Sequence, residues 1–514
     1  YFPSATIWLS AQEYSPANVS AFMKEVSSAS YLTGIVYGPH ESVTLETFDS
    51  LAPPHLPVRQ YPDLCHSAAA EFEVAHWDPA LALSHGRLAI NPAPTMFGDI
   101  ALRRLNATYA SHQVGFGAYS EGTSDDLNKC IWSALYSDAN LSPSQVVEQY
   151  SRYFFGDRAE KIGVIALYDL ERNWVGALIS NLGISIAVRR VDSLNFSTPE
   201  SWRTTAYLYR GIYDIYVWHR VRKASRVMEE VRSILSRALN STSCIALAQD
   251  ALSLLTSNKS HHTIVAYREV LLSIFKQLDA SWGGSVLQCQ APLMGTDALD
   301  IPISDNEFFA TLLTLALHLG DNVTHETIKV ILNWTDPGAF GYYDYLGGVA
   351  SDDHPHLDEG QGHETDPSYY FTPVQQAMSV GTSTPWRWGT YTQTFYDDAL
   401  SLHYHNLDPA TTYQVTIVYV AAMSNPPVRL VDGRGVVVHD YLTPTSPPLP
   451  RTYVLPYHVT KDGNLTLRVE SPQGRAGNGA HAMVSEVWLT RQGILVGPCA
   501  LGRLNLSPEL HWTC

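Results

Sequence analysis

The segment GAYSEGTSDDLNK (117–129) gathers three acidic side chains, Glu121, Asp125 and Asp126, directly after an apolar run. Cleavage of a glycosidic bond needs two carboxyl groups in different environments. One donates a proton and has a raised pKa, and the other is ionised and acts as nucleophile or water activator. The question is therefore which element presents these acids, and which partner lies beside them.

Four short β-like runs precede or enter this segment: ATIWLS (5–10), TGIVYG (33–38), PVRQYP (57–62) and VGFGAY (114–119). Helical patterns lie between them, and strands that alternate with helices predict parallel β/α units. Four units make half of an eight-stranded barrel, which normally takes about 250 residues. We expect residues 1–142 to be the C-terminal half of a TIM-type (β/α)8 barrel, strands 5–8. Because a half-barrel leaves its core unfinished, we expect an N-terminal chain or fragment of the same precursor to complete it. The opening Tyr1-Phe2-Pro3, without an initiator Met or signal peptide, fits a trimmed product.

Working residues of such barrels follow the carboxyl ends of the strands. In strand order, these positions hold Gln12 and Glu13; Tyr37, His40 and Glu41; Asp63 and His66; and Ser120, Glu121, Asp125 and Asp126. Glu121 and Asp63 follow adjacent strands, so we expect Glu121 to be the general acid and Asp63 or Asp126 its partner. Asp125 and Asp126 have an alternative role at the positive N-terminus of a helix in DDLNKCIWSAL (125–135).

Aromatic residues around this mouth either stack on sugars or pack in a core. We take Tyr37, Trp77 and Tyr119 as substrate-binding candidates, together with His66 and Asp125. The histidines lack the spacing of a zinc site, so no catalytic metal and no cofactor are expected. The run DDHPHLDEGQGHE (352–364) either binds structural Ca²⁺ or Zn²⁺ or is a solvated loop.

The remaining chain changes pattern twice. Residues 143–332 show helical periodicity, as in SPSQVVEQYSRYFFG (142–156) and in 219–239 and 262–280. Residues 333–390 are rich in Gly, Pro and Asp and predict an irregular linker. Residues 391–514 hold seven alternating segments separated by turns, which predict an antiparallel β-sandwich of a kind that can bind carbohydrate. The expected fold class is multidomain: α/β, then a helical bundle, then β.

Composition limits the classes of partner. The 45% hydrophobic content supports packed cores. A net charge of -17 argues against nucleic acid, because no Lys/Arg excess exists to neutralise phosphates. No apolar run approaches the roughly 18 residues of a membrane span.

Sequons and cysteines favour a secreted, cell-surface or lysosome-like location. N-x-S/T sequons are frequent, and we expect glycosylation at Asn18, Asn106, Asn195, Asn240, Asn258, Asn322, Asn464 and Asn505. The six cysteines lack metal spacing. Pairing of sequence neighbours gives Cys65–Cys130, Cys244–Cys289 and Cys499–Cys514, of which the last closes a short tail loop and is the pair we expect most.

Several motifs together resemble a known family. They are RQYPDLCHS, WDPALALSHGRLAINP, YSEGTSDDLNKCIWSAL, YSRYFFG, LERNWVG and NWTDPGAFGYYDYLG. They are similar to large, poorly characterised secreted proteins with a glycoside-hydrolase-like barrel, a helical domain and a C-terminal β-sandwich. The helix after the barrel also resembles that of hexosaminidase, O-GlcNAcase and α-glucuronidase type enzymes. The resemblance implies glycoside hydrolase ancestry, with Glu121, Asp125, Asp126, Asn128 and Asp63 on matching positions and Asn128 as a further substrate-binding candidate. Pro39-His40-Glu41 replaces an expected aromatic, which makes Glu41 a poor catalyst by this comparison.

The sequence thus predicts a secreted glycoside hydrolase that acts on a complex polysaccharide or glycan. One alternative is a non-catalytic extracellular coat, filament or glycan-binding protein on a former hydrolase scaffold. A second is a polysaccharide lyase that uses Tyr37, His40 and His66.

Overall fold

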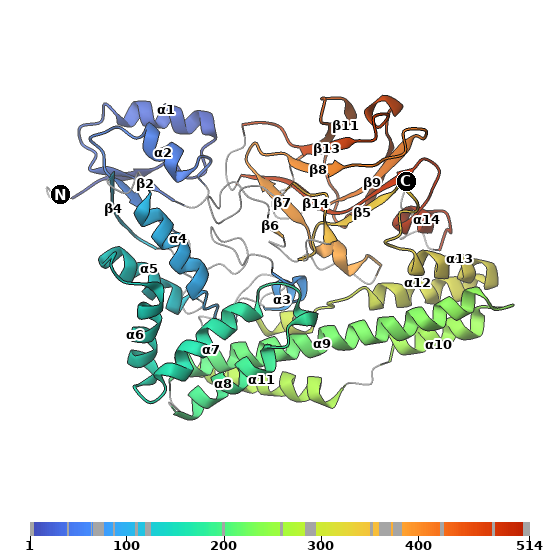
Figure 1. Ribbon diagram of the computed structural model, residues 1–514, viewed down its shortest axis with the longest axis horizontal. Helices are drawn as coiled ribbons and strands as arrows, with labels where there is room; N and C mark the ends of the chain where they lie inside the picture. The colour runs from blue at the N-terminus through green and yellow to red at the C-terminus, as the bar shows by residue number, and fades with distance from the viewer. Residues whose placement is uncertain are drawn as a thin grey trace.

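The computed structural model describes most of the chain in three connected parts: a parallel sheet with helices, a helical layer and two antiparallel sheets (Figure 1). The described residues are 5–38, 41–62, 64, 77–85, 88–107, 112–118, 125–197, 201–257, 261–282, 295–349, 353–358, 372–373, 383–421, 426–474 and 479–506. The mixed α/β class with a separate β part is therefore confirmed.

The first part contains the four predicted strands: β1 (Trp8–Ser10), β2 (Gly34–Tyr37), β3 (Val58–Gln60) and β4 (Gln113–Phe116). They pair side by side in chain order, and every pair is parallel. Within the described residues, β1 and β4 each have one neighbour, so the sheet is open at both edges. A closed barrel is thus not seen in this part of the chain.

Helices α1 (Pro16–Val26) and α2 (Leu45–Leu51) cover one face of this sheet. Val19 and Phe48 pack there against Ile35 and Val58, all fully buried. The opposite face carries the Trp8 ring, which lies across Gly34. A Cβ atom on Gly34 would lie 2.2 Å from that ring, so only glycine fits under it. Helix α4 (Pro94–Asn106) then leads into β4.

The second part is helical, and it includes two helices, α3 and α5, from the range 1–142 that we expected to form the barrel half. Its helices are α3 (Pro79–Ser84), α5 (Asp126–Ser137), α6 (Pro143–Phe155), α7 (Glu160–Asn173), α8 (Ile184–Ser197), α9 (Trp202–Leu239), α10 (Ile245–Leu255), α11 (His262–Trp282), α12 (Asn306–Leu319) and α13 (Asp321–Leu332). α6 begins with a capping box of Ser142 and Gln145 and ends at Gly156, which has a positive φ of 85°. α9 spans 38 residues and runs along the bottom of the molecule in Figure 1. Within the described residues, no helix is long and apolar enough to cross a membrane.

The third part is the predicted β-sandwich. Its strands are β5 (Tyr342–Tyr345), β6 (Thr372–Pro373), β7 (Thr392–Phe395), β8 (Leu400–Tyr404), β9 (Tyr413–Tyr419), β10 (Val428–Asp432), β11 (Val437–Leu442), β12 (Pro450–Val454), β13 (Leu465–Glu470) and β14 (Ala480–Arg491). One sheet has the order β11-β10-β13-β8, and the other the order β12-β9-β14-β7-β6, with β5 also paired to β14. A short helix, α14 (Gly497–Gly502), follows. Region 333–390 is not only a linker, because β5 lies within it and pairs antiparallel with β14.

The cysteines correct part of the expected pairing. Cys130 and Cys244 carry free thiols, so the pairs Cys65–Cys130 and Cys244–Cys289 are not formed in this structure. Burial comes first among the causes that raise the pKa of both thiols, to about 11 for Cys244, so both favour the protonated form. Cys499 is disulfide-bonded, and its expected partner Cys514 lies outside the described residues.

The expected glycosylation positions agree with accessibility where the structure describes them. The asparagine side chains that are described are all exposed, namely Asn18, Asn106, Asn240, Asn322, Asn464 and Asn505. The side chains of Asn195 and Asn258 lie outside the described residues. Attachment of glycans and secretion stay predictions.

Candidate functional site

The carboxyl edge of the parallel sheet is the first candidate site, because β3 and β4 are direct neighbours there. Gln60 at the end of β3 pairs with Phe116 at the end of β4, and the Gly117 N–H donates to the Gln60 carbonyl at 2.9 Å. Asp63 follows β3 by three residues and Glu121 follows β4 by five. Both acids, and the candidates His66 and Tyr119, lie outside the described residues. The strands that lead to the two acids are thus adjacent and parallel.

Glu41 is a carboxyl group at this edge that the sequence analysis discounted. It follows β2 and is fully buried, and Ser10 at the end of β1 donates to Glu41 Oε1 at 3.4 Å. The side chain of Gln12 crosses the backbone at Gly38, where a Cβ atom would lie 2.5 Å from the Gln12 Cδ. The loops after β1 and β2 therefore interlock at the carboxyl edge. The position of Glu41 after a strand end could have identified it as a site residue from the sequence. Nothing in the sequence pointed to Ser10.

Gln60 and Arg104 form a second polar contact near this edge. Arg104 of α4 is buried and donates from Nη1 to Gln60 Oε1 at 2.8 Å. Its guanidinium lies over the rings of Tyr37 and Trp132, 6.0 and 5.8 Å from their centroids. This contact fixes α4 against the end of β3.

Asp126 has a structural environment rather than a catalytic one. It occupies the first turn of α5, and Arg203 of α9 donates to its two oxygens at 2.8 and 3.1 Å. The Tyr150 hydroxyl donates to the same carboxylate at 2.5 Å. Burial, with the neighbouring Tyr207 and Asp126, raises the pKa of Tyr150 well above its usual value, so Tyr150 stays a donor. Asp126 lies in the first turn of α5, as in the helix-start alternative, but its carboxylate is bound by side chains of α6 and α9, so Asp126 does not enter our catalytic proposal.

Asp125 and Asn128 are also held by the protein. Asp125 is 1% exposed and pairs with Lys129 at 3.4 Å. Asn128 accepts from the Ala93 N–H at 2.9 Å and donates to the Asn91 carbonyl at 2.8 Å. Asn128 thus fixes the chain that enters α4, which is a positioning role.

Tyr37 and Trp77 are buried in the core. Tyr37 is 1% exposed, donates its hydroxyl to the Val43 carbonyl at 3.2 Å and packs edge-on against Phe48. Trp77 is 1% exposed and stacks on Trp174, with 4.9 Å between ring centroids. Neither ring offers a free face to a sugar, so the structure favours the packing alternative for both.

The role of Asp126 can be tested by stability. Asp126→Ala leaves Arg203 without its carboxylate and Tyr150 without its acceptor, and is expected to lower the free energy of unfolding by about 1–3 kcal/mol. Urea unfolding followed by circular dichroism measures the change. A matched control is Glu148→Ala on the neighbouring helix α6, an exposed position where little change is expected. An unchanged unfolding midpoint for Asp126→Ala would remove the structural assignment.

Metal binding finds no support in the described part of the chain. Among those residues, no three His, Cys, Asp or Glu side chains are grouped as metal ligands. Part of the run 352–364 lies outside them, so the Ca²⁺ or Zn²⁺ alternative for that run stays a prediction.

No family model and no curated protein matches the chain. A solved structure of a family GH115 4-O-methyl-α-glucuronidase, with specificity for decorated arabinogalactans, aligns with 88% of this chain at 11% identity and a TM-score of 0.27. The chain spans 57% of the length of that enzyme. A likeness this low carries no argument about function, so the assignment depends on the site itself.

Proposed function

We propose that this chain belongs to a secreted glycan-acting hydrolase, with Glu121 as general acid and Asp63 as the second carboxylate. The observation that supports it best is the adjacency of β3 and β4 as parallel strands, with Asp63 and Glu121 in the segments that follow their carboxyl ends. Adjacent strands lie about 4.8 Å apart. Segments that follow neighbouring strand ends can bring two carboxyl groups to one glycosidic bond.

Each carboxyl group would take a separate role in the reaction. Glu121, if kept protonated by its surroundings, donates its proton to the leaving oxygen. Asp63, kept ionised, attacks the anomeric carbon or activates a water, depending on the separation of the two groups.

The open sheet supports the expectation of a completing partner. Val114 of β4 is 58% exposed, and Leu9 of the edge strand β1 is 36% exposed. Apolar residues on parallel strands are normally covered on both faces. We propose that an N-terminal chain or fragment supplies the strands beside β1 and β4. Denaturing intact-mass analysis of the purified protein should then reveal a second polypeptide or a longer chain.

One observation favours a non-catalytic glycan-binding protein as the second candidate. Asp125, Asp126 and Asn128 are all engaged within the fold, as in a scaffold whose site has lost turnover. The lyase alternative is weakened, because Tyr37 is buried and its hydroxyl is bound to a carbonyl.

A screen for glycoside cleavage separates these candidates. The purified protein is incubated with a panel of aryl α- and β-glycosides, including hexosides, pentosides and uronides, and release of the aryl alcohol is recorded. The hydrolase proposal predicts turnover of at least one substrate. Failure on the whole panel and on polysaccharides, with retained glycan binding, would replace it with the binding protein.

A further inference from the structure

A pocket lined by residues of the segment 335–387, around strand β5, lies away from the parallel sheet. It has a volume of about 560 Å³, within the range of small-molecule sites. Its walls come from β5, the segment before it, residues 353–356 and the short 3₁₀ turn Trp386–Gly389. The pocket therefore combines groups from chain segments that are about 50 residues apart.

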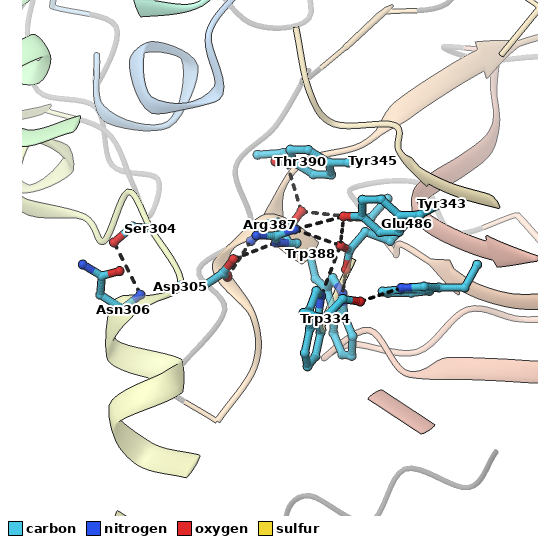
Figure 2. A network of polar contacts seen from close by, with 12 residues as sticks. Ser304, Asp305, Asn306, Trp334, Tyr343, Tyr345, Arg387, Trp388, Thr390 and Glu486 are labelled. Atoms are coloured by element: carbon cyan, nitrogen blue, oxygen red, sulfur yellow. Dashed lines mark hydrogen bonds and ion pairs between the residues drawn. The ribbon is translucent and has the colours of Figure 1, made fainter. Parts of the chain in front are cut away.

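Arg387 in the pocket wall is anchored by buried acids (Figure 2). Its Nε donates to Asp305 at 2.6 Å, and its Nη1 donates to the Tyr343 hydroxyl at 2.9 Å and to Glu486 at 3.3 Å. Burial disfavours the charge, but Asp305, Tyr343 and Glu486 outweigh it and hold the pKa of Arg387 well above its usual value. The guanidinium is thus a fixed cation in a set orientation.

Glu486 is the centre of this anchor. It lies on β14, is fully buried, and accepts from the Trp388 indole at 2.5 Å and from the Trp334 indole at 3.4 Å, in addition to Tyr343 and Arg387. Figure 2 shows the donors converging on this one carboxyl group. Such a network holds Arg387 without further help from a ligand.

One end of Arg387 remains available. In the described part of the chain, its Nη2 group makes no hydrogen bond, while the side chain is 21% exposed. Arg387 therefore presents two N–H donors that are already oriented, which suits a ligand with acceptor oxygens.

His356 offers the complementary acceptor in the same pocket. Its Nδ1 faces Asp344 at 2.8 Å, which favours the tautomer with the proton on Nδ1. Asp344 is fully buried and also accepts from the Tyr404 hydroxyl at 3.0 Å. The imidazole packs against Tyr342 and Tyr404, each 4.8 Å away between centroids. Within the described residues, its Nε2 makes no hydrogen bond, so it can accept one from a ligand hydroxyl.

Aromatic side chains form much of the remaining wall, namely Tyr342, Tyr343, Tyr345 and Trp386. Carboxyl groups outnumber the guanidinium in and behind the wall: Arg387 is paired with Asp305 and Glu486, and Asp353 also lines the pocket. An anionic ligand would meet these carboxylates, and a cationic ligand would meet the guanidinium. Aromatic faces with one fixed donor and one fixed acceptor suit a neutral ligand with neighbouring hydroxyl groups and apolar C–H faces.

We propose that this pocket binds a neutral pyranose unit of a glycan, with a sugar oxygen accepting from Arg387 Nη2 and a sugar hydroxyl donating to His356 Nε2. The site is separate from the carboxyl edge of β1–β4. The proposed function of this pocket is binding. The proposal does not depend on whether Glu121 and Asp63 catalyse hydrolysis.

Binding is tested on the whole protein with methyl β-glucoside, methyl β-galactoside, methyl α-mannoside and methyl β-xyloside, by saturation-transfer NMR and titration. Trp386→Leu removes an aromatic side chain from the wall and is expected to weaken the affinity for the sugar by about tenfold. His356→Asn keeps a donor for Asp344 but removes Nε2. This substitution is expected to weaken the affinity for the sugar by about three- to tenfold. Tyr153→Ala, at an 82% exposed tyrosine on α6, is the matched control and should bind as the wild type does.

Two further ligands test the chemical class. Methyl β-glucuronide and tetramethylammonium are titrated in parallel, and the proposal predicts that neither binds more tightly than the best neutral sugar. Stronger binding of either, or no neutral sugar binding to wild type, would overturn it. Should a variant fail to fold, titration of the wild type alone tests the proposal. The NMR signal of the His356 ring, which contacts Asp344, must shift when sugar is added. An unshifted signal overturns the proposal.

Discussion

Glu121→Gln is expected to lower the rate of glycoside hydrolysis by about 10²–10⁴-fold, because the amide cannot donate the proton that the leaving oxygen needs. The substitution keeps the size and shape of the side chain. We therefore expect an unchanged unfolding midpoint together with the loss of rate. Initial rates on the best aryl glycoside from the screen give the measurement.

Two companion variants sharpen this prediction. Asp63→Asn should show a loss of similar size, since it removes the second carboxylate. Glu25→Gln is the matched control: Glu25 lies exposed on α1 in the same α/β part, and its loss should leave the rate unchanged. Equal rates for wild type and Glu121→Gln would remove Glu121 from the mechanism.

Asp214→Ala is expected to lower the free energy of unfolding by about 3–5 kcal/mol, because it leaves Arg210 charged, buried and unpaired. Both side chains are fully buried, and Arg210 Nε donates to Asp214 at 2.8 Å. Asp214 also accepts from the indole of Trp174 at 2.7 Å, and Arg210 donates to the Leu170 carbonyl at 2.7 Å. The pair therefore joins α9 to α7 in the middle of the helical core.

Urea unfolding of three variants and the wild type tests this assignment. The control is Glu326→Ala, which removes the exposed pair of Glu326 with Lys329 and should cost no more than about 1 kcal/mol. The double variant Arg210→Met/Asp214→Leu removes both charges and should recover much of the loss. A single variant as stable as the wild type would contradict a buried ion pair at this place.

The sequence predicted the elements whose pattern is local. The four parallel strands and the seven alternating strands of the sandwich were found because apolar residues repeat at the period of each element. The first half of α9 lies in the range predicted to be helical, but it was not recognised as part of one long helix. Tyr207 to Val217 are almost all buried in the core, so that stretch lacks the polar face that marks an amphipathic helix. Strand β5 was missed because its partner β14 lies about 140 residues further along the chain.

The candidate site was predicted less well, for a related reason. The strand ends predicted the positions of the acids. The side chains that bind or cover the candidate residues, however, come from distant parts of the sequence. Arg203 reaches Asp126 across 77 residues, and Trp174 covers Trp77 across about 100. The spacing of residues in the sequence does not predict such long-range contacts. The network around Glu486 brings Asp305, Trp334 and Arg387 together. It could not be predicted from the sequence, because these residues are also far apart in the chain.

The separation of the Glu121 and Asp63 carboxyl groups in a crystal structure of the protein tests the hydrolase account most directly. The account predicts that both groups line one solvent-open pocket at the carboxyl edge of β3 and β4, about 5–10 Å apart. Carboxyl groups that point away from each other, or that are each held in an ion pair within the fold, would contradict it.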